Sequence, residues 1–148
     1  MKPETGSETV DAILVAAHRI RTAADGRLRC EGISLSSYKV LKALAAGERS
    51  MRELSDLLHV SPRTVTDLVD GLEGRGLVVR GSHPNDRRVT LLALTGAGRE
   101  RLDRARATAE ASGAAAIAGL SSSERATLRD LLRRVAALPA SEVGPRSA

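Results

Sequence analysis

The sequence predicts a mainly α-helical fold with a small β-wing, and the order of its local patterns supports this prediction. Two helix start signals, each followed by apolar residues at helical spacing, lie between Ser50 and Glu73. Two short β-branched segments, separated by a loop of turn residues, follow between Leu77 and Leu94. Longer helical patterns precede and follow this region. The order is typical of a winged helix-turn-helix lobe that lies between flanking helices.

The chain of 148 residues is long enough for one domain with a substantial core, and we expect a single domain over 1–148. The winged helix-turn-helix lobe is predicted over residues 34–95, and dimerisation helices are predicted over 9–30 and 96–138. The tails at 1–8 and 139–148 are expected to be mobile because they are polar or lack a periodic apolar pattern.

Two helices are predicted ahead of the lobe's central start signals. The first is expected to end near Gly26, with a linker carrying Cys30 behind it, and the second is expected to end at Gly47, in the position of a C-cap. The apolar residues that set these helices are Val10, Ile13, Leu14, Ala17 and Ala24 in the first, and Tyr38, Leu41, Leu44 and Ala45 in the second.

The helix-turn-helix itself is predicted from two N-terminal caps. Ser50 and Glu53 form an S-x-x-E capping box ahead of a helix expected to bury Leu54, Leu57 and Leu58. Ser61 and Pro62 are typical of an N-cap followed by the first residue of a helix. Behind them Val65, Leu68, Val69 and Leu72 form an apolar stripe. His59 lies in the turn, where the backbone needs a positive φ that histidine tolerates better than most residues.

A wing is predicted from the segments Leu77–Arg80 and Val89–Leu94. The loop Gly81–Asp86 between them is longer than a tight hairpin needs and is followed by two arginines. Two more helices are expected after the wing, from Gly96 to about Gly119 and from a capping box at Ser121 and Glu124.

The outer helices carry apolar residues on more than one face, which fits a helical dimer interface better than packing within one chain. Packing within one chain is the alternative.

Composition narrows the class of function. The net charge of +5 and the pI of about 10.3 favour a polyanionic partner, although an arginine-rich solvated surface explains the same numbers. The segment from Arg75 to Arg88 is clearly basic, with four arginines against Asp86 alone. Tyr38 is the only aromatic residue, which argues against single-strand or RNA binding by base stacking.

The expected location is the cytoplasm. Cys30 is the only cysteine, so no intramolecular disulfide can form, and neither a signal peptide nor a membrane-spanning stretch is apparent. The sequence has no nucleophile–base pair and no clustered carboxylates, so we expect no enzymatic activity. The three histidines lack metal-ligand spacing, and neither a metal nor a cofactor is expected.

The chain resembles the MarR (multiple antibiotic resistance regulator) family of bacterial transcription factors. The resemblance rests on residues 54–66 (LSDLLHVSPRTVT), 68–78 (LVDGLEGRGLV) and 84–98 (PNDRRVTLLALTGAG), and the LT-x-x-G after the DRR wing is its most specific part. It implies a homodimer on a pseudo-palindromic operator in double-stranded DNA, with a recognition helix at Ser61–Glu73 in the major groove. By the same pattern Arg88 enters the flanking minor groove, and Asp86 braces it or a neighbour. Many members repress an operon until a small phenolic ligand or an oxidant arrives.

The residues expected to contact DNA start the recognition helix and form the wing. They are Ser61, Pro62, Arg63, Thr64, Thr66 and Asp67 of the helix, and His83, Asn85, Asp86, Arg87 and Arg88 of the wing. Arginine can bind guanine in a bidentate manner, and threonine can bond a base edge or pack on thymine. Asp67 would repel phosphate unless it accepts from cytosine or pairs with Arg63. Arg75 is expected either to contact DNA or to pair with Asp86.

A candidate effector or redox site comprises His18, Arg19, Cys30 and Tyr38. Arg27 and Arg29 could lower the pKa of Cys30, although an inert cysteine is the alternative. A cavity lined by His18, Arg19 and Tyr38 would suit a small anionic molecule; a surface arginine and a packed tyrosine explain the same residues. We expect a DNA-binding regulator, most readily a repressor that a small molecule or an oxidant releases. The alternative is a winged-helix protein-interaction module with weakened DNA binding, which Asp67, Gly71 and Gly74 keep open.

Overall fold

The computed structural model describes residues 6–138. The described residues divide after Gly113 into two compact units, each of which is considered by itself. The expected tails at 1–5 and 139–148 lie outside the described residues, whereas residues 6–8 already belong to the first helix and are not a tail. The single domain expected over 1–148 stays a prediction.

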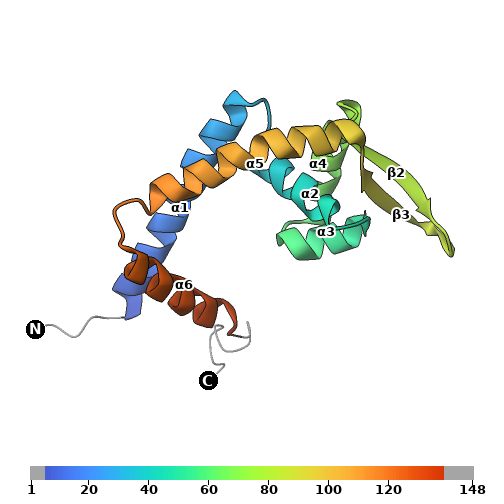
Figure 1. Ribbon diagram of the computed structural model, residues 1–148. Coiled ribbons are helices and arrows are strands. Elements are labelled where there is room, and N and C mark those ends of the chain that lie inside the picture. The colour runs from blue at the N-terminus through green and yellow to red at the C-terminus, as the bar shows by residue number, and fades with distance from the viewer. Residues whose placement is uncertain (1–5, 139–148) are drawn as a thin grey trace, which may run out of the picture. The chain divides into compact units, whose positions relative to one another are not determined.

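The elements follow the predicted mainly helical order with a small antiparallel sheet. In chain order they are α1 (Gly6–Cys30), α2 (Leu35–Ala45), β1 (Arg49–Ser50), α3 (Met51–Leu58), α4 (Pro62–Gly74), β2 (Val78–His83), β3 (Asp86–Leu94), α5 (Gly96–Ala116) and α6 (Ser122–Ala136) (Figure 1). Within this order α3 and α4 are the helix-turn-helix and β2 and β3 are the wing.

The first helix is longer than predicted, because Gly26 does not end it. α1 continues for another turn to Cys30, and the chain leaves the helix at Gly32, whose φ is +74°. A glycine inside a helix costs only about 1 kcal/mol relative to alanine, so Gly26 alone is a weak stop signal. α2 lies where the sequence predicts it, between an N-cap at Ser34 and Gly47, whose φ is +141°.

The predicted caps of the helix-turn-helix are confirmed. The Ser50 hydroxyl accepts the Glu53 N–H at 3.2 Å, and the Glu53 carboxylate accepts the Ser50 N–H at 2.7 Å, which lowers the pKa of Glu53. His59 has φ 52° and ψ 45°, the left-handed conformation expected for the turn. Leu57, predicted to be buried, is 55% exposed instead, and Leu54 is the fully buried leucine of α3.

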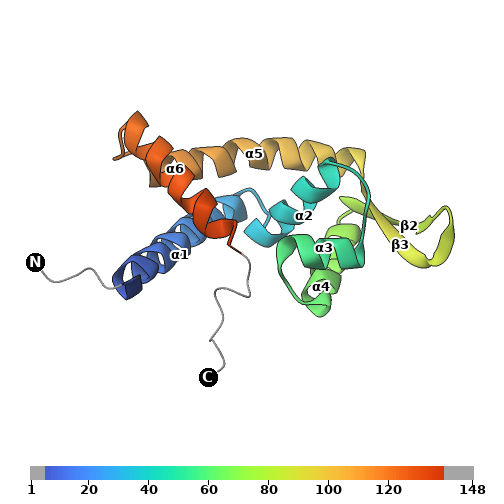
Figure 2. The same ribbon diagram turned by 90° about the horizontal axis from the view of Figure 1, so that it is seen from below.

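The sheet has three strands in the order β1-β3-β2, all antiparallel. β1 was not predicted, since two residues carry no periodic signal, and it pairs Arg49 with Leu92. The long loop predicted over Gly81–Asp86 is wrong. Gly81 and Ser82 continue the β2 ladder, a bulge follows, and only Pro84 and Asn85 make the turn. The wing is therefore a long hairpin, which projects away from α2, α3 and α4 in Figures 1 and 2.

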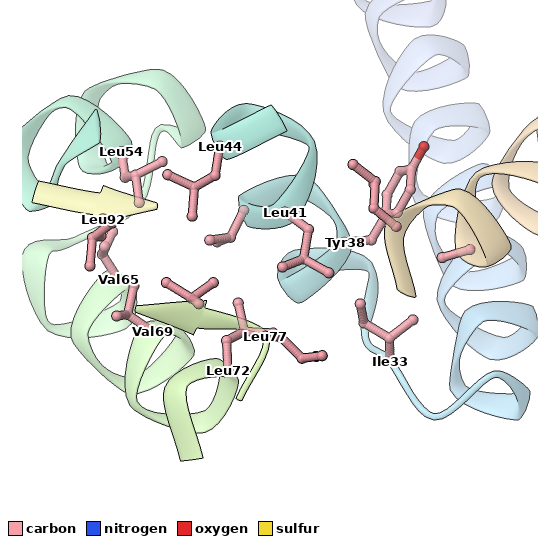
Figure 3. Packing of buried hydrophobic residues seen from close by; sticks show 14 of the residues in the cluster. Ile33, Tyr38, Leu41, Leu44, Leu54, Val65, Val69, Leu72, Leu77 and Leu92 are labelled. Carbon is pink, nitrogen blue, oxygen red and sulfur yellow. The ribbon is translucent and has the colours of Figure 1, made fainter. Parts of the chain in front are cut away.

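The core of the lobe lies where α2, α3, α4 and the sheet meet. Figure 3 shows Leu44 of α2, Leu54 of α3 and Leu92 of β3 converging on one side of it. The largest fully buried side chains are Leu28, Leu41, Leu54, Leu72, Leu92, Leu102, Val40, Val65, Val69 and Val78. The apolar stripe predicted for α4 is thus the face that fixes the helix to the lobe, and the opposite face is left to solvent.

The LT-x-x-G motif forms a close joint between α5 and the turn before β2. Thr95 donates its hydroxyl to the Gly76 carbonyl at 2.6 Å and accepts the Gly98 N–H at 3.0 Å. A Cβ at Gly98 would lie 2.0 Å from the Leu77 carbonyl oxygen and 2.9 Å from the Leu94 Cδ1 atom. The close contact between α5 and the Leu77 backbone therefore requires a glycine at position 98, the last residue of the motif.

The outer helices carry large exposed apolar side chains. On α1 these are Val10, Leu14, Val15 and Ile20, and on or just after α6 they are Leu128, Leu131, Leu132, Val135 and Leu138. The predicted capping box of Ser121 and Glu124 is confirmed, while α5 ends at Ala116 instead of about Gly119. Among the described residues, no helix is both long enough and apolar enough to cross a bilayer.

Candidate nucleic-acid interface

Ser61 caps the N-terminus of α4. Its hydroxyl accepts the Thr64 N–H at 3.1 Å and lies 2.8 Å from the Thr64 hydroxyl, and Pro62 follows as the first helical residue. A capped helix N-terminus presents unpaired N–H groups and a partial positive charge, both of which favour phosphate. Ser61, Pro62 and Thr64 are exposed around this end of the helix.

The outward face of α4 is polar and open to a ligand. Arg63, Thr66 and Asp67 are all exposed, opposite the buried Val65 and Val69. The Thr66 hydroxyl donates to the Pro62 carbonyl at 3.0 Å, which leaves its methyl group and the acceptor lone pairs of its oxygen for a partner. Pairing of Asp67 with Arg63 was one of two alternatives for this acid, and it is not formed: the ion pairs within 6–138 are Asp25–Arg29 and the two made by Arg80.

The tip of the wing presents two arginines. Arg87 and Arg88 are exposed on β3, next to the Pro84–Asn85 turn. The Asp86 carboxylate accepts the Arg88 backbone N–H at 2.9 Å, so it braces the backbone of that arginine and not its guanidinium. The half-exposed His83 accepts the Asn85 N–H through Nδ1 at 3.1 Å. The five predicted wing residues therefore lie together around one tight turn.

Arg80 joins the wing to α4, a role that sequence reasoning missed. From β2 its Nη2 atom donates to Asp70 at 2.5 Å, and its Nη1 atom donates to Glu73. The hydrogen bond to Asp70 is the largest cause that raises the pKa of Arg80. Because the sequence places Arg80 in a basic cluster with Arg75, Arg87 and Arg88, only the spacing of acids on α4 could have revealed its partners.

A sequence profile described as MarR family matches residues 31–89. The chain is 30% identical over 121 residues to the uncharacterized regulator YkoM of Bacillus subtilis (strain 168), covering 81% of this chain and 75% of that relative. It is 36% identical over 107 residues to YdgJ of the same organism, covering 72% of this chain and 65% of YdgJ, slightly less than two thirds of that relative. A mutant of E. coli MarR complexed with operator DNA superposes with a TM-score of 0.79 at 27% identity, covering 87% of this chain and 92% of that one.

The chain belongs to the MarR family. The resemblance read from the sequence is thereby confirmed, as are the mainly helical winged-helix fold and the regulator class in place of an enzyme. The MarR profile covers α2, α3, α4 and the tip of the wing, which are the elements that carry the exposed polar side chains described above.

Arg75 does not pair with Asp86 in this MarR-family lobe. Its Nη2 atom donates to the Gly32 carbonyl at 2.7 Å, and Arg101 of α5 donates to the neighbouring Glu31 carbonyl. Two cations thus lie at the C-terminal end of α1, where the helix dipole favours positive charge. They connect α1 to the end of α4 and to α5, and sequence alone gives no sign of contacts that span 43 and 70 residues.

The candidate effector or redox residues are not gathered into one site. His18 and Arg19 are exposed on α1, whereas Tyr38 is 8% exposed and packs in the core of the lobe. Cys30 is exposed at the end of α1, with its thiol 3.5 Å from the Gly26 carbonyl oxygen. Three surface hollows are lined by other residues, mainly of α2, α3 and the wing. A role for these four residues stays a prediction.

Proposed function

We propose that the protein is a homodimeric, sequence-specific regulator that binds double-stranded DNA. The observation that carries this proposal is the pairing of two exposed polar surfaces in one MarR-family lobe. One is the capped start of α4 with Arg63 and Thr66, and the other is the wing tip with Arg87 and Arg88. The first suits base edges in a major groove, and the second suits the narrow, electronegative minor groove beside it.

The E. coli MarR complex supports this proposal, because a relative of the same fold and family binds operator DNA. Arg63 lies one helical turn before Asp67 on the same face of α4, so both side chains can reach the same short stretch of a groove. In this assignment Arg63 binds guanine, and Asp67 accepts from a cytosine amino group.

The test is an anisotropy titration of the full chain on labelled DNA from its own upstream intergenic region, with an unrelated duplex alongside. We expect selective binding whose logarithm of affinity falls linearly with the logarithm of salt concentration, because arginine contacts release counterions from phosphate. Equal, weak binding to both duplexes, with a flat response to salt, would contradict the proposal.

A protein-docking lobe is the second candidate, and the charge of α4 favours it. Between Pro62 and Gly74 the helix carries Arg63 against Asp67, Asp70 and Glu73, a net charge of −2. Such a helix would suit a basic protein partner as well as a groove. The same titration separates the two functions, since a docking lobe has no need to select one duplex over another.

The dimer is proposed from the exposed apolar side chains of the outer helices. Leu131 is 49% exposed and Val135 is 55% exposed on α6, and a second copy of the chain would cover them. We expect Leu131→Glu to convert the dimer into a monomer in light scattering at micromolar concentration. Leu57→Glu, an equally exposed leucine on α3, is the control and should leave the dimer intact. A dimer unaffected by Leu131→Glu would contradict this interface.

We further propose that the regulator represses transcription and is released by a small molecule or an oxidant. The support is family membership and the exposed thiol of Cys30. A release of labelled operator by peroxide that Cys30→Ser abolishes would support the oxidant as the signal.

A further inference from the structure

We propose that Arg80 is a positioning residue that pairs with two carboxylates on the recognition helix and offsets part of their negative charge, so that α4 can approach the phosphate backbone. This inference rests on the proposed DNA-binding function and deepens it. Arg80 is not among the residues expected to contact DNA. Its effect on affinity passes through Asp70 and Glu73, the acids that it binds.

Arg80 binds two carboxylates of α4 at the same time. The guanidinium of Arg80 uses two different nitrogen atoms for two different carboxylates, Nη2 for Asp70 at 2.5 Å and Nη1 for Glu73. The three side chains are 30%, 58% and 39% exposed, so the cluster lies at the surface. It is therefore in place to change the potential that an approaching polyanion meets.

Asp70 lies on the outward face of α4. It follows Arg63 by seven residues and Asp67 by three, so all three side chains share this face. Glu73 follows the buried Val69 by four residues and lies at the edge of that face, toward β2. Arg80 thus spans from the edge of the helix to the face that is proposed to enter the groove.

The recognition helix α4 is negatively charged without Arg80. With one arginine against three acids, α4 alone has a net charge of −2, and Gly71 and Gly74 add no cation to offset it. Arg80 adds one positive charge to this surface, which makes its net charge −1 instead of −2, and binds two of the three acids, so that Asp67 is the acid left to read a base. Exposed ion pairs contribute little to folding stability, so the main consequence of this cluster is expected in DNA binding.

The test compares four forms of the full chain by anisotropy titration on the upstream duplex. They are the wild type, Arg80→Met, the double variant Asp70→Asn with Glu73→Gln, and the triple variant that combines all three changes. Methionine keeps the length of the side chain and removes its charge. Arg106→Met, on the exposed surface of α5, is the matched control for the loss of one positive charge.

We expect Arg80→Met to weaken binding by about tenfold at low salt and by less at high salt, because salt screens the repulsion from uncovered acids. The triple variant should bind within about threefold of the double variant, since neither has acids for Arg80 to cover. Arg106→Met should stay near the wild type. Thermal unfolding midpoints within a few degrees of the wild type exclude a general loss of structure.

A triple variant as weak as Arg80→Met would overturn the proposal, because Arg80 would then contact DNA itself or act only by holding the wing. Arg80→Met that binds as well as the wild type would overturn it too. Failure of the wild type to select its own duplex would instead reject the proposed function, on which this inference rests.

Discussion

Gly98→Ala is expected to destabilise the protein more than any other single methyl addition to a glycine of the described chain. The new Cβ would lie 2.0 Å from the Leu77 carbonyl oxygen, and backbone cannot move aside as the end of a side chain can. Overpacking of this kind costs typically 1–3 kcal/mol and occasionally more, so we expect a loss of about 3 kcal/mol or greater in the free energy of unfolding. Urea unfolding followed by circular dichroism measures it.

Gly113→Ala is the matched control for this variant. Gly113 lies in the same helix, α5, and a Cβ there meets nothing within 4 Å. Alanine is the better helix former, so this change should stabilise the protein by about 0.5–1 kcal/mol. Equal unfolding midpoints for the two variants would show that α5 does not approach the backbone of Leu77 as closely as described.

Arg88→Ala is expected to weaken binding to the upstream duplex by about tenfold or more, the range for an arginine in a narrow minor groove or on a base. Arg88 is exposed at the wing tip, and its backbone is held by Asp86 at 2.9 Å, so its position does not depend on DNA. Because the fold does not depend on any bond of the Arg88 side chain, the unfolding midpoint and the dimer should be unchanged. The anisotropy titration measures the loss.

Arg87→Ala is the neighbouring control. Adjacent residues of a strand point to opposite faces, so Arg87 is expected to meet phosphate and its loss should cost less and affect both duplexes alike. An Arg88→Ala curve that overlays the wild type would reject the assignment of this residue to the minor groove.

Local signals in the sequence were sufficient for the helix boundaries that depend on caps. Ser50, Ser61 and Ser121 each bond an N–H three residues later, so the signal and its effect lie within one turn. The boundary at Gly26 failed because a glycine inside a helix is tolerated when the helix is stabilised elsewhere. Strand β1 and the extended hairpin failed because they depend on pairing with β3, including Gly81 and Ser82, which have little preference for strands.

The candidate interface divides in the same way. Arg63, Arg87 and Arg88 could be predicted because their place in a helix or strand fixes their exposure. The partners of Arg75 and Arg80 could not, since a side chain that reaches another element depends on the tertiary structure. Arg75 thus donates to the Gly32 carbonyl, whereas Arg80 donates to two carboxylates. The count of four arginines in the segment from Arg75 to Arg88 therefore overstated the charge available to DNA.

Hydroxyl-radical footprinting of the wild type and Arg88→Ala on the upstream duplex would show which groove each element occupies. We propose that α4 enters a major groove while the wing arginine enters the minor groove beside it. At saturating protein, the wild type should protect sugars over two half-sites and in the flanking minor grooves, and Arg88→Ala should lose the flanking protection alone. Identical protection for the two proteins, or none for either, would contradict this proposal.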